Sequence, residues 1–203
     1  AIDFDFFNDM PARKDDGFMR IGWTVSQSHL KEWKQIRVAI GEVLKANPKV
    51  KFTVFGQCFS WGRDIPLSRL ERVKWADNHG EYVYNLISAG LDMAICPLKD
   101  DRFNWKKSPI KWEEFSAMGV PCVMSKVLYG DYVRDNETGL LYGDMAGFKS
   151  QLQRLIDETE TRKRIGKAAY DEIKINYDLN KIVDIYADAF RELVFSHIIK
   201  IQE

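Results

Sequence analysis

The sequence predicts an α/β protein built on a Rossmann-like, doubly wound parallel sheet with flanking helices. Two apolar runs, at residues 93–96 and 121–124, have the character of buried strands, and a helix-like segment that begins near Pro109 and ends at Gly119 lies between them. A strand, a helix and a strand at this spacing form a βαβ unit, whose two strands are parallel neighbours. Strand and helix patterns alternate in the same way along most of the chain.

The expected elements follow the hydrophobic pattern along the chain. Strands are expected at residues 18–26, 52–56, 72–75, 92–98 and 121–125, with an irregular connection at 58–71. Helices are expected from the hydroxyl-rich stretch near residue 26 to residue 46, and at 82–89, 109–119, 148–156, 161–175 and 179–199. The apolar stripes of the closing helices are expected in the core: Phe148, Leu152, Leu155, Ile182, Ile185, Phe190 and Leu193.

Length and composition fit one globular domain. The chain has 203 residues, of which 45% are hydrophobic and 30% charged, and its formal net charge is +0; this length can bury a sizeable core. The balanced charge and a pI near 7.1 argue against a nucleic-acid binder that relies on a broad basic field. No run reaches the roughly 18 apolar residues of a membrane span, and the acidic start shows no signal peptide. We therefore expect a cytoplasmic protein without a nucleic-acid partner.

The cysteines and histidines predict no metal site. Cys58, Cys96 and Cys122 are widely spaced, and the last two lie inside expected strands. They have the character of small buried hydrophobes in a reducing compartment. The three histidines share no ligand spacing with them.

The segment from residue 103 to 121 carries most of the expected chemistry. Lys107, Lys111 and Glu114 fall at i, i+4 and i+7 and share one helix face. A helix that begins just past the carboxyl end of a strand directs free N–H groups and a positive dipole into the crevice where open α/β sheets bind ligands. Two lysines there favour a multiply charged anion such as a diphosphate, and a carboxylate further along suits the paired hydroxyls of a ribose. The alternative is a solvated helix face that bears an i,i+4 lysine pair.

This segment resembles the donor-binding helix of retaining, group-1-type (family 4-like) glycosyltransferases of the GT-B fold. The matching residues are Phe103, Asn104, Lys107, Ser108, Lys111, Glu114 and the run 117–121. In that family the glutamate five residues before the glycine binds the donor's ribose hydroxyls, and the resemblance implies this role for Glu114. The better-known family motif has another glutamate eight residues earlier, facing the sugar, and this chain has Lys106 there.

The resemblance covers roughly residues 18–178 and implies further contacts with a donor. The loop after the first strand, with Gly22 and residues 24–29, would approach the diphosphate, although the arginine usual in that loop is not evident. His29 also has a plain alternative role as a first-turn residue of the following helix. The loop after residues 72–75 would lie against the nucleotide base. Residues 136–142 resemble a hairpin-like family element in which Gly139 would supply a turn.

Together these patterns define the expected site. The expected catalytic residues are Lys107, Lys111 and Glu114. The expected substrate-binding residues are Gly22, Thr24, Ser26, His29, Trp75, Asp77, Asn104, Lys106, Ser108 and Ile110. No metal ligand is expected, because helix N–H groups and lysines can themselves stabilise a departing diphosphate.

The resemblance implies that the chain is the donor-binding half of a two-domain glycosyltransferase of polysaccharide biosynthesis. Residues 1–16 would be a linker or N-terminal extension and residues 17–203 the donor-binding domain. The donor would be a nucleotide diphosphate sugar, bound as a substrate without any cofactor. The partner would be an N-terminal acceptor-binding domain of the same enzyme, which would also make any peripheral membrane contact. The isolated half is expected to transfer no sugar, and the missing initiator methionine suggests a fragment or a processed product.

Other functions remain open, because a fold alone does not choose among them. A nucleotide-sugar epimerase or a phosphorylase of the same fold would use the same diphosphate site with acid–base groups from the other domain. A non-catalytic nucleotide-sugar-binding module is the third alternative, and Lys106 at the sugar-facing position favours it. The run Asp3-Phe4-Asp5 resembles the DxD metal motif of the other major glycosyltransferase fold, but no nucleotide-binding βαβ pattern comes before it here.

Overall fold

The computed structural model describes residues 1–7, 16–56 and 64–201, with side chains up to residue 194; Cys58 and residues 59–63 of the connection expected at 58–71 lie outside the described residues. The described chain forms a six-stranded sheet in the order β3-β2-β1-β4-β5-β6, and every neighbouring pair is parallel. The strands are β1 (Met19–Val25), β2 (Val50–Gly56), β3 (Leu70–Val73), β4 (Met93–Cys96), β5 (Cys122–Ser125) and β6 (Leu140–Tyr142). This is the strand order of doubly wound folds, in which the order reverses beside β1. The predicted fold class is therefore confirmed.

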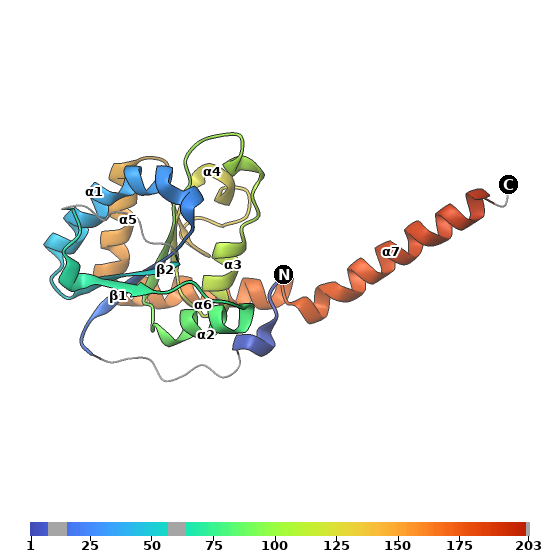
Figure 1. The fold of residues 1–203 in the computed structure, drawn as a ribbon, viewed down its shortest axis with the longest axis horizontal. Helices are drawn as coiled ribbons and strands as arrows, with labels where there is room; N and C mark the ends of the chain where they lie inside the picture. Colours follow the sequence, from blue (N-terminus) through green and yellow to red (C-terminus); the bar gives the residue numbers. More distant parts are fainter. Residues whose placement is uncertain (8–15, 57–63, 202–203) are drawn as a thin grey trace.

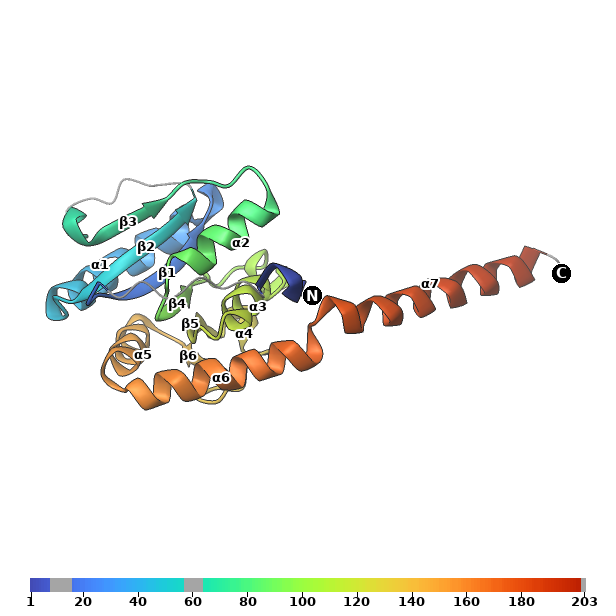
Figure 2. The ribbon, with the colours of Figure 1, turned by 90° about the horizontal axis from the view of Figure 1, so that it is seen from below.

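Helices cover both faces of the sheet (Figures 1 and 2). The helices are α1 (Leu30–Ala46), α2 (His79–Ser88), α3 (Ile110–Ala117), α4 (Lys126–Tyr129), α5 (Met145–Asp157), α6 (Thr159–Asn176) and α7 (Leu179–Ile201). Buried side chains of α1 and α5 pack on one face of the sheet, and those of α2 and α3 pack on the other. The helix α6 contacts both α3 and α5.

Strand β1 shows how the sequence sorts side chains between these two faces. Successive side chains of a strand point to opposite sides, and Ile21, Trp23 and Val25 lie in the cluster beneath α1 and α5. The Trp23 ring stacks on Trp33 of α1 at 6.1 Å and on Phe52 of β2 at 6.3 Å between ring centroids. A central parallel strand is covered on both faces, and this aromatic group fixes α1 against one of them.

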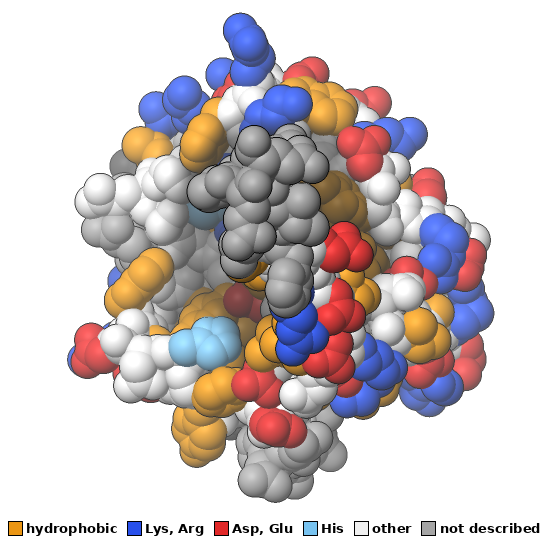
Figure 3. All heavy atoms as spheres, turned by 90° about the vertical axis from the view of Figure 1, so that its right-hand side faces the viewer, with side chains coloured by type: hydrophobic (Ala, Val, Ile, Leu, Met, Phe, Trp, Pro, Cys, Tyr) orange, Lys and Arg blue, Asp and Glu red, His pale blue; other side chains and the backbone are white. Residues whose placement is uncertain are grey.

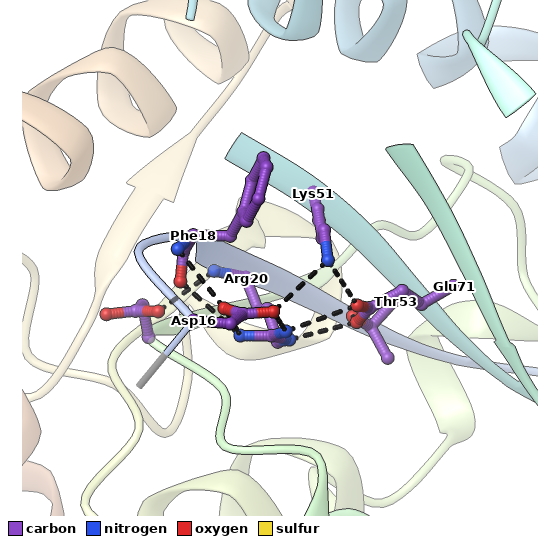
Figure 4. Close-up of polar contacts among 7 residues, drawn as sticks. Asp16, Phe18, Arg20, Lys51, Thr53 and Glu71 are labelled. Carbon is purple, nitrogen blue, oxygen red and sulfur yellow. Dashed lines mark hydrogen bonds and ion pairs between the residues drawn. The ribbon is translucent and has the colours of Figure 1, made fainter. Parts of the chain in front are cut away.

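The other face of β1 begins with a charged cluster (Figure 4). The Arg20 guanidinium, whose side chain is 1% exposed, lies 2.6 Å from Asp16 and 2.9 Å from Glu71. Lys51 Nζ lies 3.2 Å and 3.1 Å from the same two carboxylates, and the Thr53 hydroxyl donates to Glu71 at 2.9 Å. The Arg20 hydrogen bond holds the pKa of Asp16 well below its usual range. Arg20, Lys51 and the two carboxylates thus join three neighbouring strands, and the backbone N–H of Arg20 also donates to the buried Asp92 at 2.9 Å.

Two local expectations need correction. The short edge strand lies at Leu70–Val73 rather than at 72–75, so Trp75 belongs to the loop that follows it. Gly139 does not supply the left-handed residue of the turn, because that conformation falls on Asn136, with φ 62°. A Cβ at Gly139 would instead lie 2.2 Å from Cε of Met124 and 2.9 Å from Cγ1 of Val133, so these two side chains pack closely against this glycine.

The prediction that the apolar stripes of the closing helices lie in the core is correct for α5 and wrong for α7. Phe148, Leu152 and Leu155 of α5 are 0% exposed, as predicted. The stripe on α7 is wrong as a core prediction, because Ile185 and Phe190 are 68% and 66% exposed. The reason is the direction of α7, which projects away from the sheet in both ribbon views (Figures 1 and 2).

The first residues of the chain pack on the face that α2 and α3 cover. Ile2, Phe4 and Phe7 are buried there. The backbone N–H of Ile2 donates to Tyr177 O at 2.7 Å, and the N–H of Leu179 donates to Ile2 O at 2.8 Å. The start of the chain therefore runs beside the junction of α6 and α7. No helix among the described residues combines the length and the apolar character that crossing a membrane requires.

Candidate functional site

A cavity of about 410 Å³ opens at the carboxyl ends of β1 and β2, beside α2 and α3. Its lining comes from the β1 end and the following loop, the β2 end, the loop after β3, α2 and α3: Thr24, Val25, Ser26, His29, Phe55, Gly56, Lys74, Trp75, Ala76, Asn78, His79, Tyr82, Asn85, Ile110, Lys111 and Glu114. Figure 3 views the end of the molecule from which α7 projects and shows a hollow with hydrophobic and histidine side chains around it. The cavity lies next to β1, where the strand order reverses, which is the usual ligand position of this fold.

Lys111 is a cation of this cavity, which Lys74 also lines, and is only partly exposed. Its Nζ donates to the backbone oxygen of Thr24 at 2.7 Å and lies 2.8 Å from His29 Nε2. Burial, with the nearby positive charge of Lys107, lowers the pKa of Lys111 to about 8. No ion pair to a carboxylate holds Lys111 among the described residues.

His29 supports Lys111 from the loop that follows β1. Its side chain is buried, and Nδ1 accepts from the backbone N–H of Ser26 at 3.1 Å. Burial first, and then the positive charges of Lys111 and Lys107, lower the pKa of His29 to about 4. The ring is therefore neutral at physiological pH and adds no charge beside Lys111. The predicted first-turn position of His29 is also seen, at the end of a short 3₁₀ helix (Gln27–His29).

Glu114 lies one turn after Lys111 on α3 and is the acid of the cavity. Its Oε2 accepts a hydrogen bond from the hydroxyl of Tyr82, on α2, at 2.7 Å. Burial raises the pKa of Glu114, while the Tyr82 hydrogen bond and the charge of Lys111 act in the opposite direction. A carboxylate with one oxygen held in this way can accept further hydrogen bonds from ligand hydroxyls.

Lys107 and Ser108 line a second, smaller cavity of about 210 Å³ that shares His29, Ile110 and Lys111 with the first. Lys107 Nζ lies 5.0 Å from the centroid of the Phe103 ring. The two lysines expected to hold an anion therefore both line the smaller cavity, and Lys111 also lines the larger one.

Trp75 lines the large cavity from the loop after β3, and its side chain is 66% exposed. Gly56, at the end of β2, has φ +100°. A Cβ there would lie 2.4 Å from Val25 O and 3.0 Å from Cε3 of Trp75. Glycine at this position therefore allows the indole ring to lie over the ends of the strands, where it could stack on a planar group.

Four of the expected residues line neither cavity. Gly22 packs inside the sheet, where a Cβ would lie 2.4 Å from Cδ1 of Leu91. The Asn104 side chain is 2% exposed and donates to Glu32 at 3.0 Å and to Lys99 O at 2.9 Å, which organises the loop before α3. Asp77 lies just before α2, where its N–H donates to Glu81, and Lys106 is exposed at the end of a short 3₁₀ helix (Asn104–Lys106) before α3. Their contacts with a donor stay predictions.

The motif at residues 103–121 did not identify the side chains that α2 contributes to the larger cavity, above all Tyr82 and Asn85. The sequence does carry one signal for it, since Asn78 precedes the helix and its side chain accepts from the N–H of Glu81 at 2.9 Å. This cap fixes where α2 begins, and therefore which of its side chains reach the ends of the strands.

A family profile described as "Glycosyl transferase-like" matches residues 34–188, more than half of the chain. This chain belongs to that family. A comparison with curated proteins gave no significant match. Among solved structures, it is similar to the C-terminal domain of the group 1 family glycosyl transferase LpcC from Francisella tularensis, at 18% identity and a TM-score of 0.66, over 88% of this chain and 100% of that domain.

Two longer proteins show the same likeness. HepE from Anabaena, in complex with UDP and glucose, is 13% identical with a TM-score of 0.70, over 94% of this chain and 55% of HepE. Sucrose-phosphate synthase from Thermosynechococcus elongatus is 14% identical with a TM-score of 0.68, over 96% of this chain and 51% of that protein. The glycosyltransferase-like chain thus has the fold of one GT-B half and spans about half of these two proteins.

Proposed function

We propose that this chain is the donor-binding half of a glycosyltransferase and binds a nucleotide diphosphate sugar in the two adjoining cavities. The observation that carries the proposal is the position of Lys111 and Glu114, one turn apart on α3, in one cavity at the carboxyl ends of the strands. Lys111 and Lys107 would hold the diphosphate, Glu114 the ribose hydroxyls, and Trp75 the base. HepE, a protein of similar fold, was solved with UDP, which makes UDP the first ligand to test.

The proposed chemistry is transfer of the sugar from the diphosphate to an acceptor. As the bond between the anomeric carbon and the diphosphate oxygen breaks, negative charge grows on that oxygen. A cation placed near that charge in a water-poor site stabilises the transition state, and Lys111 and Lys107 supply such cations here. With the lysines in this role the transfer needs no metal ion. The acceptor would be held by an N-terminal domain of the same enzyme, so the chain alone would bind the donor and transfer no sugar.

The alternatives use the same diphosphate site. An epimerase or phosphorylase would differ in groups outside this half, and a non-catalytic module would bind the donor without reacting. Lys106, which stands where the family motif has a sugar-facing glutamate, is the feature that favours the last of these. A cytoplasmic location and a role in polysaccharide biosynthesis are part of the proposal.

Binding by calorimetry tests the proposal directly. We expect UDP, or another nucleoside diphosphate of a panel with the common bases, to bind more tightly than its nucleoside. Lys107→Ala should reduce this preference, because a unit charge pair at about 4 Å is worth roughly 4 kcal/mol at an effective dielectric near 20, before desolvation is subtracted. The effect should shrink as salt rises. Lys34→Ala, an exposed lysine on α1, is the matched control. Equal affinity for diphosphate and nucleoside throughout the panel would contradict the proposal.

A further inference from the structure

The hydrogen bond between Tyr82 and Glu114 joins two helices that are far apart in the sequence. It spans 2.7 Å from the hydroxyl to Oε2 and connects α2 to α3 across the cavity that both residues line. Hydrogen bonds from a hydroxyl to a carboxylate are short and strong when the acceptor is ionised. Both side chains are only partly exposed, so water competes weakly for this bond.

The bond also bears on the charge of Glu114. Burial pushes the pKa of Glu114 up, and so does Glu113 next to it, whereas the Tyr82 hydrogen bond and then Lys111 push it down. Lys74 and His79 line the same cavity. Tyr82 thus opposes the protonation that burial favours in the empty site.

A ligand would bind to the acceptor positions of the Glu114 carboxylate that Tyr82 does not occupy. An ionised carboxylate accepts through two oxygens and about four lone-pair positions, and Tyr82 occupies one position on Oε2. In the described part of the chain no other hydrogen bond to Glu114 is present, which leaves Oε1 free to accept from a ligand.

We propose that Tyr82 is a positioning residue for the ribose-binding carboxylate, holding Oε2 of Glu114 so that Oε1 accepts a hydrogen bond from the ribose 2′-hydroxyl. This inference rests on the proposed function, which supplies the ribose. A purely structural tie between α2 and α3 is the competing explanation. The two differ because a structural tie affects every ligand equally, whereas a positioning residue affects ligands according to their ribose hydroxyls.

The experiment compares Tyr82→Phe with Tyr84→Phe. Tyr84 lies on the same helix, is 64% exposed and lines neither cavity. Dissociation constants are measured by calorimetry for UDP and 2′-deoxy-UDP, with GDP and 2′-deoxy-GDP as a second pair, between pH 5.5 and 8. Thermal unfolding of each variant confirms that it is folded.

We expect Tyr82→Phe to weaken ribonucleotide binding by about tenfold, the range for one hydrogen bond to a charged group. Binding of the 2′-deoxy nucleotide should weaken clearly less. The loss should grow as the pH falls, because Glu114 without the Tyr82 hydrogen bond takes up a proton at higher pH and stops accepting. Tyr84→Phe should leave all these values unchanged. In a Glu114→Gln background, Tyr82→Phe should add little further loss.

Several outcomes would overturn the inference. Equal losses for the ribo and 2′-deoxy nucleotides, independent of pH, would show that Tyr82 acts only as a tie between helices. So would a Tyr82→Phe protein that binds like Tyr84→Phe, or a full additional loss in the Glu114→Gln background. In those cases the wild-type protein still binds nucleoside diphosphates and the proposed function stands. A wild-type protein that binds none of the four nucleotides would overturn the proposed function together with this inference.

Discussion

Replacing Lys111 by methionine should stabilise the empty protein while it weakens nucleotide binding. Burial lowers the pKa of Lys111 from 10.5 to about 8, and each tenfold change in proton affinity corresponds to about 1.4 kcal/mol. The charged side chain therefore destabilises the folded state by up to about 3 kcal/mol below pH 8. Methionine has a similar length and no charge. It loses the hydrogen bond to Thr24 O, worth about 1 kcal/mol, and the partial exposure of Lys111 reduces the gain further.

The net expectation is a gain of about 1–2 kcal/mol at pH 7, which for a chain of this length raises Tm by roughly 3–6 °C. The sign depends on pH. Between pH 8 and 10.5 the unfolded state binds a proton at Lys111 that the folded state has lost, so the stability of the wild-type protein rises with pH and the advantage of Lys111→Met fades. Denaturant unfolding at pH 7 and pH 10 measures both values. Lys34→Met, at an exposed position of α1, is the control.

The same variant should bind UDP at least about tenfold more weakly, because the proposed diphosphate site would lose a cation. A Lys111→Met protein that is less stable than wild type at pH 7, or whose stability differs from wild type by the same amount at pH 7 and pH 10, would refute the reasoning. Lys111 would then be a satisfied structural lysine.

Two further predictions concern stability. The pKa of His29 is lowered from 6.5 to about 4 in the folded protein, so acidification protonates this histidine in the unfolded state first. The free energy of unfolding should therefore drop by about 2 kcal/mol between pH 7 and pH 5. His29→Gln should flatten this part of the curve of unfolding free energy against pH, and a variant with the wild-type curve would contradict the prediction. Gly56→Ala should destabilise by about 2 kcal/mol or more, because its φ is +100° and Val25 O leaves no room for a Cβ. Gly143→Ala, where no atom lies within 4 Å of the added Cβ, is its control in the same thermal melts.

The sequence predicts the sheet well because its central strands are apolar on both faces. Residues of β4 and β5 form short apolar runs that fit only a buried parallel strand, and the structure buries all of them. The edge strand β3 is harder to place. Its sequence, Leu70-Glu71-Arg72-Val73, has no continuous apolar character, and its position is decided by pairing with β2.

Amphipathic periodicity predicts that a helix face is covered but does not identify the element that covers it. On α5 the cover is the sheet, and Leu152 is 0% exposed. On α7 the same kind of stripe leaves Phe190 66% exposed, because the helix leaves the body of the fold after Asp178. The direction of a helix depends on its junction, which periodicity does not encode.

In the candidate site, too, the sequence predicts residues that lie close together in the chain but not contacts between distant segments. Lys111 is four residues after Lys107, and Glu114 is eight residues after Lys106, so a short sequence pattern identifies both. Tyr82 is 32 residues from Glu114, and their contact depends on how α2 and α3 pack on the sheet. A pattern in one segment has no means of finding such a pair.

The cations at the two ends of the sheet, Arg20 and Lys111, differ in whether a carboxylate pairs with them, and this difference distinguishes a structural cation from a candidate binding residue. Arg20, at the amino-terminal end of β1, is buried and is paired with Asp16 and Glu71, so its charge is neutralised within the protein (Figure 4). Lys111 of α3 reaches the carboxyl end of the same strand, where its Nζ contacts the backbone oxygen of Thr24 and the His29 ring. A buried cation without a carboxylate partner destabilises the empty protein, and such groups gather at functional sites. In the proposed site a diphosphate would supply the counter-charge that no carboxylate of the described residues provides at ion-pair distance, which is why the stability gain of Lys111→Met and its loss of nucleotide affinity should appear together.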